Sequence, residues 1–133
     1  MKPHYEVVGV VIFEEGKLLS FKRGASKYPY VAHKYEFAGG KVEPGERRED
    51  ALKRELKEEL DMSIEVESLF ASNTFEYPDF SITLWVYDCI RTSDFALKEH
   101  ESFAWLSPKD LDAKEWAPAD EDVIGTIKRV FGE

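Results

Sequence analysis

The feature that most constrains this 133-residue chain is an acidic segment, GGKVEPGERREDALKRELKEELDM, which spans Gly39 to Met62. Leucines recur at every fourth position within it, at Leu52, Leu56 and Leu60. The residues from Asp50 to Leu60 are all good or neutral helix formers. A four-residue apolar repeat of this kind is typical of a helix with one buried face. The pattern therefore predicts a helix over Asp50–Leu60.

Three carboxylates lie along one edge of this predicted helix. At about 100° per residue, Glu55, Glu58 and Glu59 share an arc beside the leucine stripe. Carboxylates gathered at the edge of a core raise one another's pKa unless a positive charge lies among them. Glu oxygens suit Mg²⁺ or Mn²⁺, so the pattern predicts a divalent cation site. The alternative is a solvated acidic face with ion pairs along the helix.

The glycine pair Gly39-Gly40 stands at a short distance before the helix. Glycine lets the backbone approach a ligand closely because it has no Cβ. We therefore expect the carbonyl of Gly39 to reach the same cation, with a simple turn as the alternative.

Composition narrows the class of protein. Hydrophobic residues make up 43% of the chain and aromatic residues 14%, which is typical of a folded domain, and we expect one domain over residues 1–133. Eighteen basic against 27 acidic residues give a net charge of −9, which argues against nucleic acid polymers and acidic membranes as partners. The single cysteine cannot form an internal disulfide, and there is no signal peptide or long apolar run. We expect a cytoplasmic protein.

The rest of the chain alternates strand patterns with two helical ones. Strands are predicted at Tyr5–Phe13, Leu18–Arg23, Tyr35–Phe37, Ile64–Tyr77, Phe80–Ile90 and Phe103–Leu106. A helical turn is predicted from Ser107 as N-cap, with Pro108 at its first position. A last helix is predicted over Asp120–Phe131, with Ile124, Ile127, Val130 and Phe131 on its inner face. The result is an α+β fold in which helices pack on a mixed sheet.

The spacing of the acidic segment resembles the Nudix box, G-x5-E-x7-R-E-U-x-E-E-x-G-U, where U is a bulky apolar residue. The matching residues are Gly40, Glu46, Arg54, Glu55, Leu56, Glu58, Glu59 and Met62. Only the last glycine differs, being Asp61 here. That glycine usually ends the helix at positive φ, which Asp tolerates better than most residues.

The resemblance extends from about Val7 to Ile127. The segments KYEFAGGKVEP, FSITLWVY, EHESFAWLSP and WAPADEDVI look like the MutT-like branch, and the last two look like its CTP pyrophosphohydrolase group. The resemblance implies an α/β/α sandwich and Mg²⁺-dependent hydrolysis of a nucleoside triphosphate, with Mn²⁺ as a substitute, to monophosphate and pyrophosphate. It also implies that the Gly39 carbonyl, Glu55, Glu58 and Glu59 hold the metal, while Glu46 and Arg54 brace the loop and helix as an ion pair.

Further roles follow from the same resemblance. Arg23 matches a position that contacts substrate phosphate, unless it is an ordinary surface arginine, and Lys41 is placed for a similar part. Glu101 lies where relatives carry an added metal ligand or base, with Glu99 as the alternative.

The base is harder to assign. Tyr35, Phe37, Tyr77 and Trp116 are candidates for a stacking wall, although packing in the core explains any one of them equally well. Asp120 matches a base-reading position and is also a candidate N-cap. A carboxylate accepts hydrogen bonds and the cytosine amino group donates them, which favours CTP, dCTP and 5-hydroxy- or 5-methyl-dCTP. A protonated Asp120 pairs equally with an oxidised purine, so an enzyme that removes 8-oxo-dGTP is the alternative.

Other classes of function stay open. The same fold serves hydrolases of ADP-ribose and dinucleoside polyphosphates, and it also serves nucleotide-binding modules without activity. Such modules commonly lose carboxylates of the motif, whereas all are present here, so an enzyme is favoured. Both a monomer and a homodimer fit the sequence.

Overall fold

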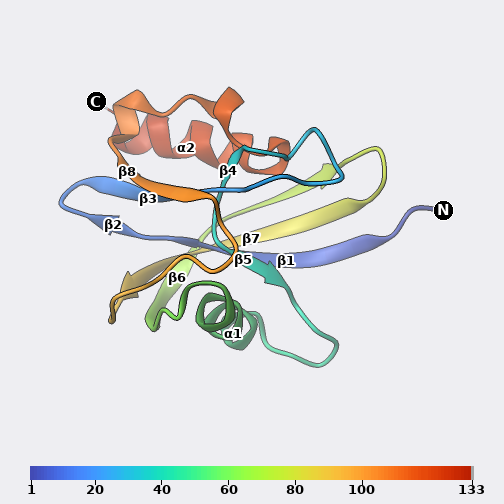
Figure 1. Ribbon diagram of the computed structural model, residues 1–133, viewed down its shortest axis with the longest axis horizontal. Helices are drawn as coiled ribbons and strands as arrows, with labels where there is room; N and C mark the ends of the chain where they lie inside the picture. The colour runs from blue at the N-terminus through green and yellow to red at the C-terminus, as the bar shows by residue number, and fades with distance from the viewer. Residues whose placement is uncertain (133) are drawn as a thin grey trace.

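Two four-stranded β-sheets lie between two helices in the computed structural model, which describes residues 1–132 (Figure 1). Glu133, the last residue of the expected domain, lies outside the described residues. The strands are β1 (His4–Val11), β2 (Phe13–Glu14), β3 (Lys17–Lys22), β4 (Tyr35–Glu36), β5 (Gly39–Lys41), β6 (Ile64–Glu76), β7 (Ser81–Arg91) and β8 (Ser102–Leu106). The helices are α1 (Arg48–Leu60) and α2 (Glu121–Phe131), with 3₁₀ turns at Pro108–Asp110, Ala113–Glu115 and Pro118–Asp120.

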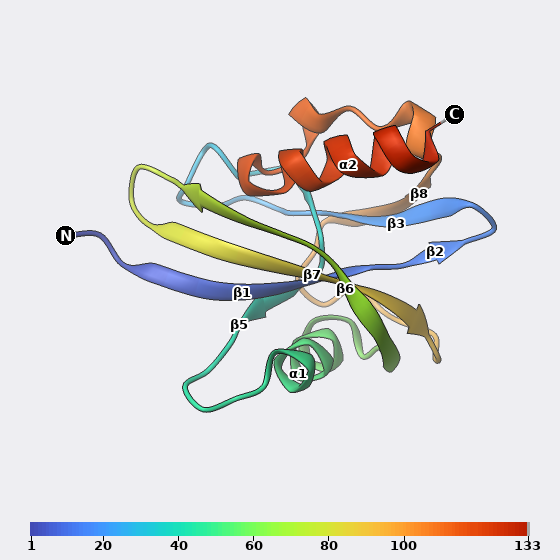
Figure 2. The same cartoon turned by 180° about the vertical axis from the view of Figure 1, so that it is seen from behind.

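The first sheet is mixed and has the strand order β5-β1-β7-β6. Strand β1 runs parallel to β7, whereas β5 and β6 are antiparallel to their neighbours. In the second sheet, β3 is antiparallel to β2, β4 and β8. Seen from behind, the long strand β6 passes between the levels of α1 and α2 (Figure 2). The predicted α+β sandwich with a mixed sheet is therefore confirmed.

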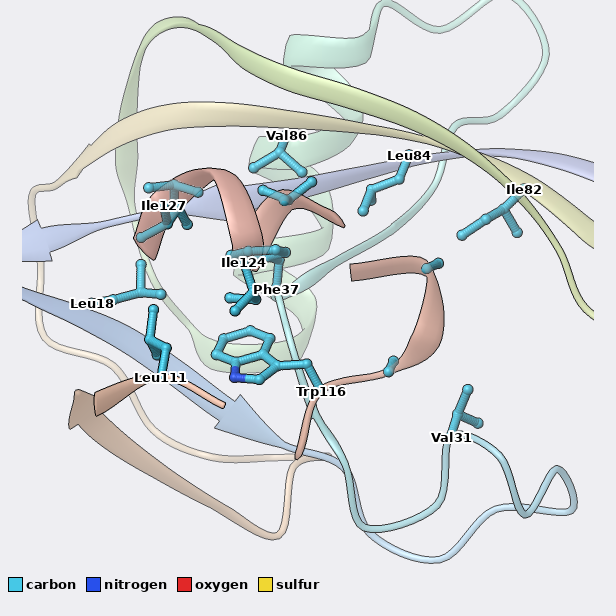
Figure 3. Close-up of a cluster of buried hydrophobic side chains, with 14 of the residues drawn as sticks. Leu18, Val31, Phe37, Ile82, Leu84, Val86, Leu111, Trp116, Ile124 and Ile127 are labelled. Carbon is cyan, nitrogen blue, oxygen red and sulfur yellow. The ribbon is translucent and has the colours of Figure 1, made fainter. Parts of the chain in front are cut away.

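Side chains that alternate along β1 divide the core in two. Val8 and Val10 belong to the cluster that covers α1, whereas Val7 and Val11 contact the cluster beneath α2. Successive residues of a strand point to opposite faces of the sheet, so one apolar strand serves both clusters. Leu52, Leu56 and Leu60 are fully buried in the α1 cluster, and Figure 3 shows the α2 cluster around Trp116. The leucine repeat thus fixes which side of α1 meets the sheet.

The C-terminus of α1 explains why Asp61 replaces the usual glycine. Asp61 has φ 51° and ψ 37°, in the left-handed region. Its N–H donates to the carbonyl of Lys57, and the N–H of Met62 donates to that of Leu56. The bond from Asp61 to Lys57 is that of the αL helix ending, which places a left-handed residue after the last helical turn. The expected conformation of Asp61 is confirmed.

The structure corrects several local expectations. The predicted strand Tyr5–Phe13 is split at Ile12, where the chain passes from the first sheet to the second. The short strand β5 was not expected, because its glycines have low strand propensity and pairing with β1 alone holds them extended.

Ser107 and Asp120 stand at the predicted N-cap positions, with Pro108 at the start of its turn, but neither caps its helix through the side chain. The side chains of Ser107 and Asp120 make no capping hydrogen bond, and Asp120 has helical dihedrals because a 3₁₀ turn runs directly into α2.

The buried face of α2 is formed by residues 123, 124 and 127, whereas Val130 and Phe131 are 55% and 49% exposed. The ring of Phe131 still packs on that of Phe13, with centroids 5.1 Å apart. Within residues 1–132, neither helix is long and apolar enough to cross a membrane.

Replacement of Gly39 by Ala is expected to destabilise the fold. A Cβ at Gly39 would lie 1.9 Å from the carbonyl oxygen of Val8, and its φ is +156°. Backbone atoms of two paired strands cannot separate cheaply, so we expect a loss on the order of 2 kcal/mol or more. Gly24→Ala is the matched control, because nothing lies within 4 Å of its Cβ position. Thermal unfolding of both variants measures the difference, and equal midpoints would show that the contact with Val8 is unimportant.

Candidate active site

Arg54 on α1 joins the loop, the helix and strand β5. Its Nε and Nη2 donate to the two carboxylate oxygens of Glu46, each at 2.9 Å, and Nη2 also donates to the carbonyl of Lys41 at 3.1 Å. Its Nη1 donates to Glu55 at 2.8 Å and lies 3.5 Å from a carboxylate oxygen of Glu58. The ion pair that the sequence predicts between Glu46 and Arg54 is therefore present and bidentate. Through it, the loop that precedes α1 is fixed to the helix.

Electrostatics follow from these contacts. The hydrogen bond from Arg54, with a further one from the backbone N–H of Glu43, lowers the pKa of Glu46 to about 2. Glu55 behaves differently, because burial raises its pKa more than the guanidinium of Arg54 lowers it. Arg54 therefore keeps Glu46 ionised, whereas at Glu55 it does not fully offset the cost of burying the carboxylate.

The two glycines before the helix make room for different neighbours. A Cβ at Gly40 would lie 2.3 Å from Oε2 of Glu55, so the carboxylate occupies the space that a side chain would fill. At Gly39 the obstacle is the backbone of Val8. The sequence suggested that Gly39 lacks a side chain for the sake of a cation. In the structure, the close packing of Gly39 against β1 already requires glycine there, whereas a side chain at Gly40 would displace the carboxylate of Glu55.

The surroundings of Glu59 disfavour its ionised form. Burial, followed by the negative charges of Glu36, Glu55 and Glu99, raises its pKa to about 8. A backbone hydrogen bond from Gly39 offsets part of this effect. Its Oε1 is buried and has no hydrogen-bond partner. Glu58, by contrast, has a side chain that is 59% exposed, so the three glutamates of the predicted arc differ in their surroundings.

These residues fit a divalent cation. Their donors are hard oxygen atoms, one of which has no partner, and their charges repel one another without a compensating ion. Among residues 1–132, no three Asp, Glu, His or Cys side chains are already gathered in a metal-holding arrangement.

The structure chooses between the two acids that the sequence left open in the segment before β8. Glu99 raises the pKa of both Glu55 and Glu59, so its charge faces the carboxylate site. Glu101 has a different contact: its Oε1 lies 2.9 Å from Nδ1 of His33, and its N–H donates to the carbonyl of Lys22. The structure therefore favours Glu99 over Glu101 as the added acid, and a role of Glu101 at the site stays a prediction.

A cavity of about 380 Å³ extends from Glu59 to the apolar cluster beneath α2. Glu59, Gly39, Gly40 and Lys41 line one part of it, and Asp120 lines another. Its aromatic lining is formed by Tyr5, Tyr28, Phe37, Tyr77 and Phe80. The cavity thus has a polar part beside Glu59 and an apolar part lined by aromatic rings, a combination that is common in small-molecule binding sites.

The predicted stacking wall needs correction. Phe37 and Tyr77 line the cavity, but Trp116 is only 1% exposed and lies in the core, with its ring 5.0 Å from that of Phe37 (Figure 3). Tyr35 packs on Trp116 at 5.6 Å and does not line the cavity either.

The missed aromatic residues are Tyr5, Tyr28 and Phe80. Tyr28 belongs to the irregular loop before β4, and Phe80 belongs to the turn between β6 and β7. The aromatic runs KYPY and YPDF were the signal in the sequence, but no periodicity in a loop tells which way a ring points.

Asp120 is buried, with 6% of its surface exposed. Burial, followed by the charge of Glu36, raises its pKa well above the ordinary value, although a backbone hydrogen bond from Phe37 acts in the opposite direction. Burial therefore favours the neutral form of this carboxyl group at the apolar part of the cavity.

The two cationic side chains expected at the phosphates both line the cavity, and both have partners. Arg23 donates from Nη1 to Glu36 at 3.0 Å. Lys41 has its Nζ 3.8 Å from the ring centre of Tyr5. Glu36 was not singled out in the sequence, yet it lies at the cavity and affects the pKa of Glu59 and of Asp120. Its place three residues before Gly39 was the available signal.

Comparison with known proteins agrees with this geometry. Residues 3–126 match the family model described as the NUDIX domain. The chain is 37% identical over 131 residues to the 8-oxo-dGTP diphosphatase of Escherichia coli K12, with 98% of this chain and 100% of that protein covered. It is 36% identical to the CTP pyrophosphohydrolase of the same organism, with 86% and 84% covered. The solution structure of the E. coli ORF135 protein superposes with a TM-score of 0.83 at 34% identity, over 97% and 91% of the two chains.

The pKa of Glu59 predicts how stability depends on pH without metal. Its folded-state pKa, about 8, lies above its unfolded value, so the folded state binds the proton more tightly than the unfolded state. Stability should therefore fall as pH rises from about 4.5 to about 8. Glu59→Gln should make this part of the profile flatter. Thermal unfolding in EDTA across this range, for the wild type and the variant, measures it, and parallel profiles would contradict the assignment. Glu65→Gln, exposed on β6, is the matched control.

Proposed function

This chain belongs to the Nudix hydrolase family, and from that premise we propose that it hydrolyses cytosine nucleoside triphosphates to the monophosphate and pyrophosphate. The observation that carries the proposal is the single cavity that connects Glu59 with Asp120. One part of this cavity suits a metal-bound triphosphate, and the other suits a flat base between aromatic rings. A net charge of −9 disfavours nucleic acid polymers but not a small anion accompanied by a cation.

Nudix hydrolases generally use a divalent metal ion such as Mg²⁺. In this chain the carbonyl of Gly39 and the carboxylates of Glu55, Glu58 and Glu59 would hold it, with Glu99 as a further candidate. The bound ion offsets phosphate charge and makes a water molecule more acidic. Mn²⁺ suits the same oxygen donors.

The protein's own groups account for orientation and proton transfer. Arg54 fixes Glu55 and, through Glu46, the loop that carries Gly40. Glu99 comes from a separate segment, and its charge acts on both Glu55 and Glu59. Its carboxylate would accept the proton of the attacking water. Glu59 would lose its raised pKa once a cation lies beside it. Arg23 and Lys41 are placed to contact the phosphates after exchanging their present partners.

Base selection rests on the neutral carboxyl group of Asp120. A protonated carboxyl group has one O–H donor and one carbonyl acceptor. Cytosine presents an acceptor ring nitrogen beside a donor amino group, so the two edges complement each other. CTP, dCTP and their 5-hydroxy and 5-methyl forms share this edge. Asp120 is therefore proposed to read cytosine in its neutral form, whereas the sequence alone suggested an ionised acceptor.

A second candidate substrate is 8-oxo-dGTP. It is favoured by the identity of 37% over 98% of the chain with a protein named for that activity. The same carboxyl group can donate to a purine carbonyl and accept from a protonated ring nitrogen. Both candidates use the same phosphate chemistry and differ only in the apolar compartment.

A panel of nucleotides separates the candidates. With Mg²⁺ present, kcat/KM for CTP, dCTP and 5-methyl-dCTP should exceed that for 8-oxo-dGTP at least about tenfold, which corresponds to one well-made base contact. Release of monophosphate and pyrophosphate is measured, and EDTA should abolish it. A preference for 8-oxo-dGTP would overturn the cytosine proposal. Absence of pyrophosphate from every nucleotide would overturn the enzymatic one.

Replacement of Asp120 tests the neutral carboxyl group. Asp120→Asn keeps one donor and one acceptor and should retain about a third or more of kcat/KM for dCTP. Asp120→Ala removes both and should lose about 10- to 100-fold. Asp122→Ala, which is exposed on the same helix, is the matched control. If Asn were as damaging as Ala while thermal unfolding showed both folded, Asp120 would not read the base in this form.

A further inference from the structure

His100 is buried beside the site, yet the functional assignments above do not use it. Only 3% of its side chain is exposed, and its Nδ1 is buried without a hydrogen-bond partner. Among residues 1–132, the one other buried side-chain atom of this kind is Oε1 of Glu59. Buried polar atoms in native proteins are rarely left without a hydrogen-bond partner. The unpaired Nδ1 therefore suggests that the position of His100 serves a function.

The other ring nitrogen of His100 makes a defined contact. Its Nε2 lies 2.9 Å from Oε2 of Glu36, while Oε1 of Glu36 accepts from Nη1 of Arg23 at 3.0 Å. Each oxygen of Glu36 therefore has one partner. With Glu36 as the acceptor of both contacts, the histidine donates to it from a proton on Nε2.

The position of the imidazole is fixed by its surroundings. Its ring packs on that of Phe21 in β3, with centroids 5.2 Å apart. The next residue, Glu101, donates its N–H to the carbonyl of Lys22, and the antiparallel pairing of β3 with β8 follows directly. The histidine is thus held in one place against the second sheet.

The contact decides how Glu36 can hold Arg23. A carboxylate and a guanidinium prefer to pair through two parallel hydrogen bonds. With one oxygen already bound to His100, Glu36 offers Arg23 only the other. The guanidinium then keeps most of its N–H groups unpaired by Glu36 at the wall of the cavity.

We propose that His100 is a positioning residue for substrate phosphate. Its Nε2–H occupies one oxygen of Glu36, and so prevents that carboxylate from pairing with the Arg23 guanidinium through both oxygens. This inference rests on the proposed function, because it assigns Arg23 to the triphosphate. Without the histidine donor, Glu36 turns fully to Arg23, and phosphate has to compete for the guanidinium.

Three substitutions at one position separate the hydrogen bond from packing. His100→Gln places an amide nitrogen close to the position of Nε2, so it should keep KM for the preferred nucleotide within about twofold of wild type. His100→Asn places its amide near the position of Nδ1 and cannot reach Glu36, and His100→Leu has no donor. Both should raise KM about tenfold while kcat changes less than about threefold, since the carboxylates of α1 are untouched.

The same substitution made in a Glu36→Gln variant tests whether His100 acts through Glu36. In Glu36→Gln the competing carboxylate is absent, so adding His100→Leu should change KM no further. Thermal unfolding checks that each variant is folded, and if His100→Leu is not, the comparison of Gln with Asn carries the test. Wild-type KM in His100→Asn, a Gln variant as poor as Asn, or an equal effect of His100→Leu in both backgrounds would overturn the proposal.

The proposal is also testable without catalysis. A long-range ¹H–¹⁵N spectrum of the full chain should show His100 protonated at Nε2. Protonation at Nδ1 alone would overturn the positioning role whatever the enzyme does. If the wild type released no pyrophosphate from any nucleotide while Nε2 carried the proton, the proposed function would fail and the hydrogen bond to Glu36 would stand.

Discussion

The guanidinium of Arg54 is the interaction on which the rest of the site depends. It contacts the loop through Glu46, strand β5 through the carbonyl of Lys41, and its own helix through Glu55. Because a planar group with five donors can satisfy all of them at once, Lys in this place could not keep the same geometry.

Placing carboxylates beside a core has a cost that the molecule does not remove by itself. The leucines of α1 bring its backbone against the sheet, and Glu55 and Glu59 are carried with it into partial burial. Glu36 and Glu99 then add negative charge from other segments. A cavity arranged in this way is poorly compensated when empty and is well matched to a cation bound with a polyphosphate. The same Glu36 helps to keep Asp120 neutral, so the charges at the phosphates influence how the base is read.

Local pattern sufficed where the chemistry lies on one helix. The spacing of Glu55, Glu58 and Glu59 against the leucine repeat follows from 3.6 residues per turn, and the left-handed ending at Asp61 follows from helix capping. The ion pair of Glu46 with Arg54 joins neighbours in one motif. Most strands were foreseen from their β-branched and aromatic runs, although β5 was not, since glycine has no strand preference and only pairing with β1 makes it extended.

The sequence by itself determined that a glycine pair and a carboxylate-rich helix follow one another with the spacing of the Nudix box, and with it the family to which the chain belongs. Only the tertiary structure decided what surrounds them. It brought the charge of Glu99 to bear on Glu59 and set Glu101 against His33. It also placed Trp116 in the core and Tyr28 and Phe80 at the cavity. The physical reason is that these residues lie in loops or irregular turns, where no period of 2 or 3.6 fixes the direction of a side chain. Their directions are set by contacts with strands far away in the sequence.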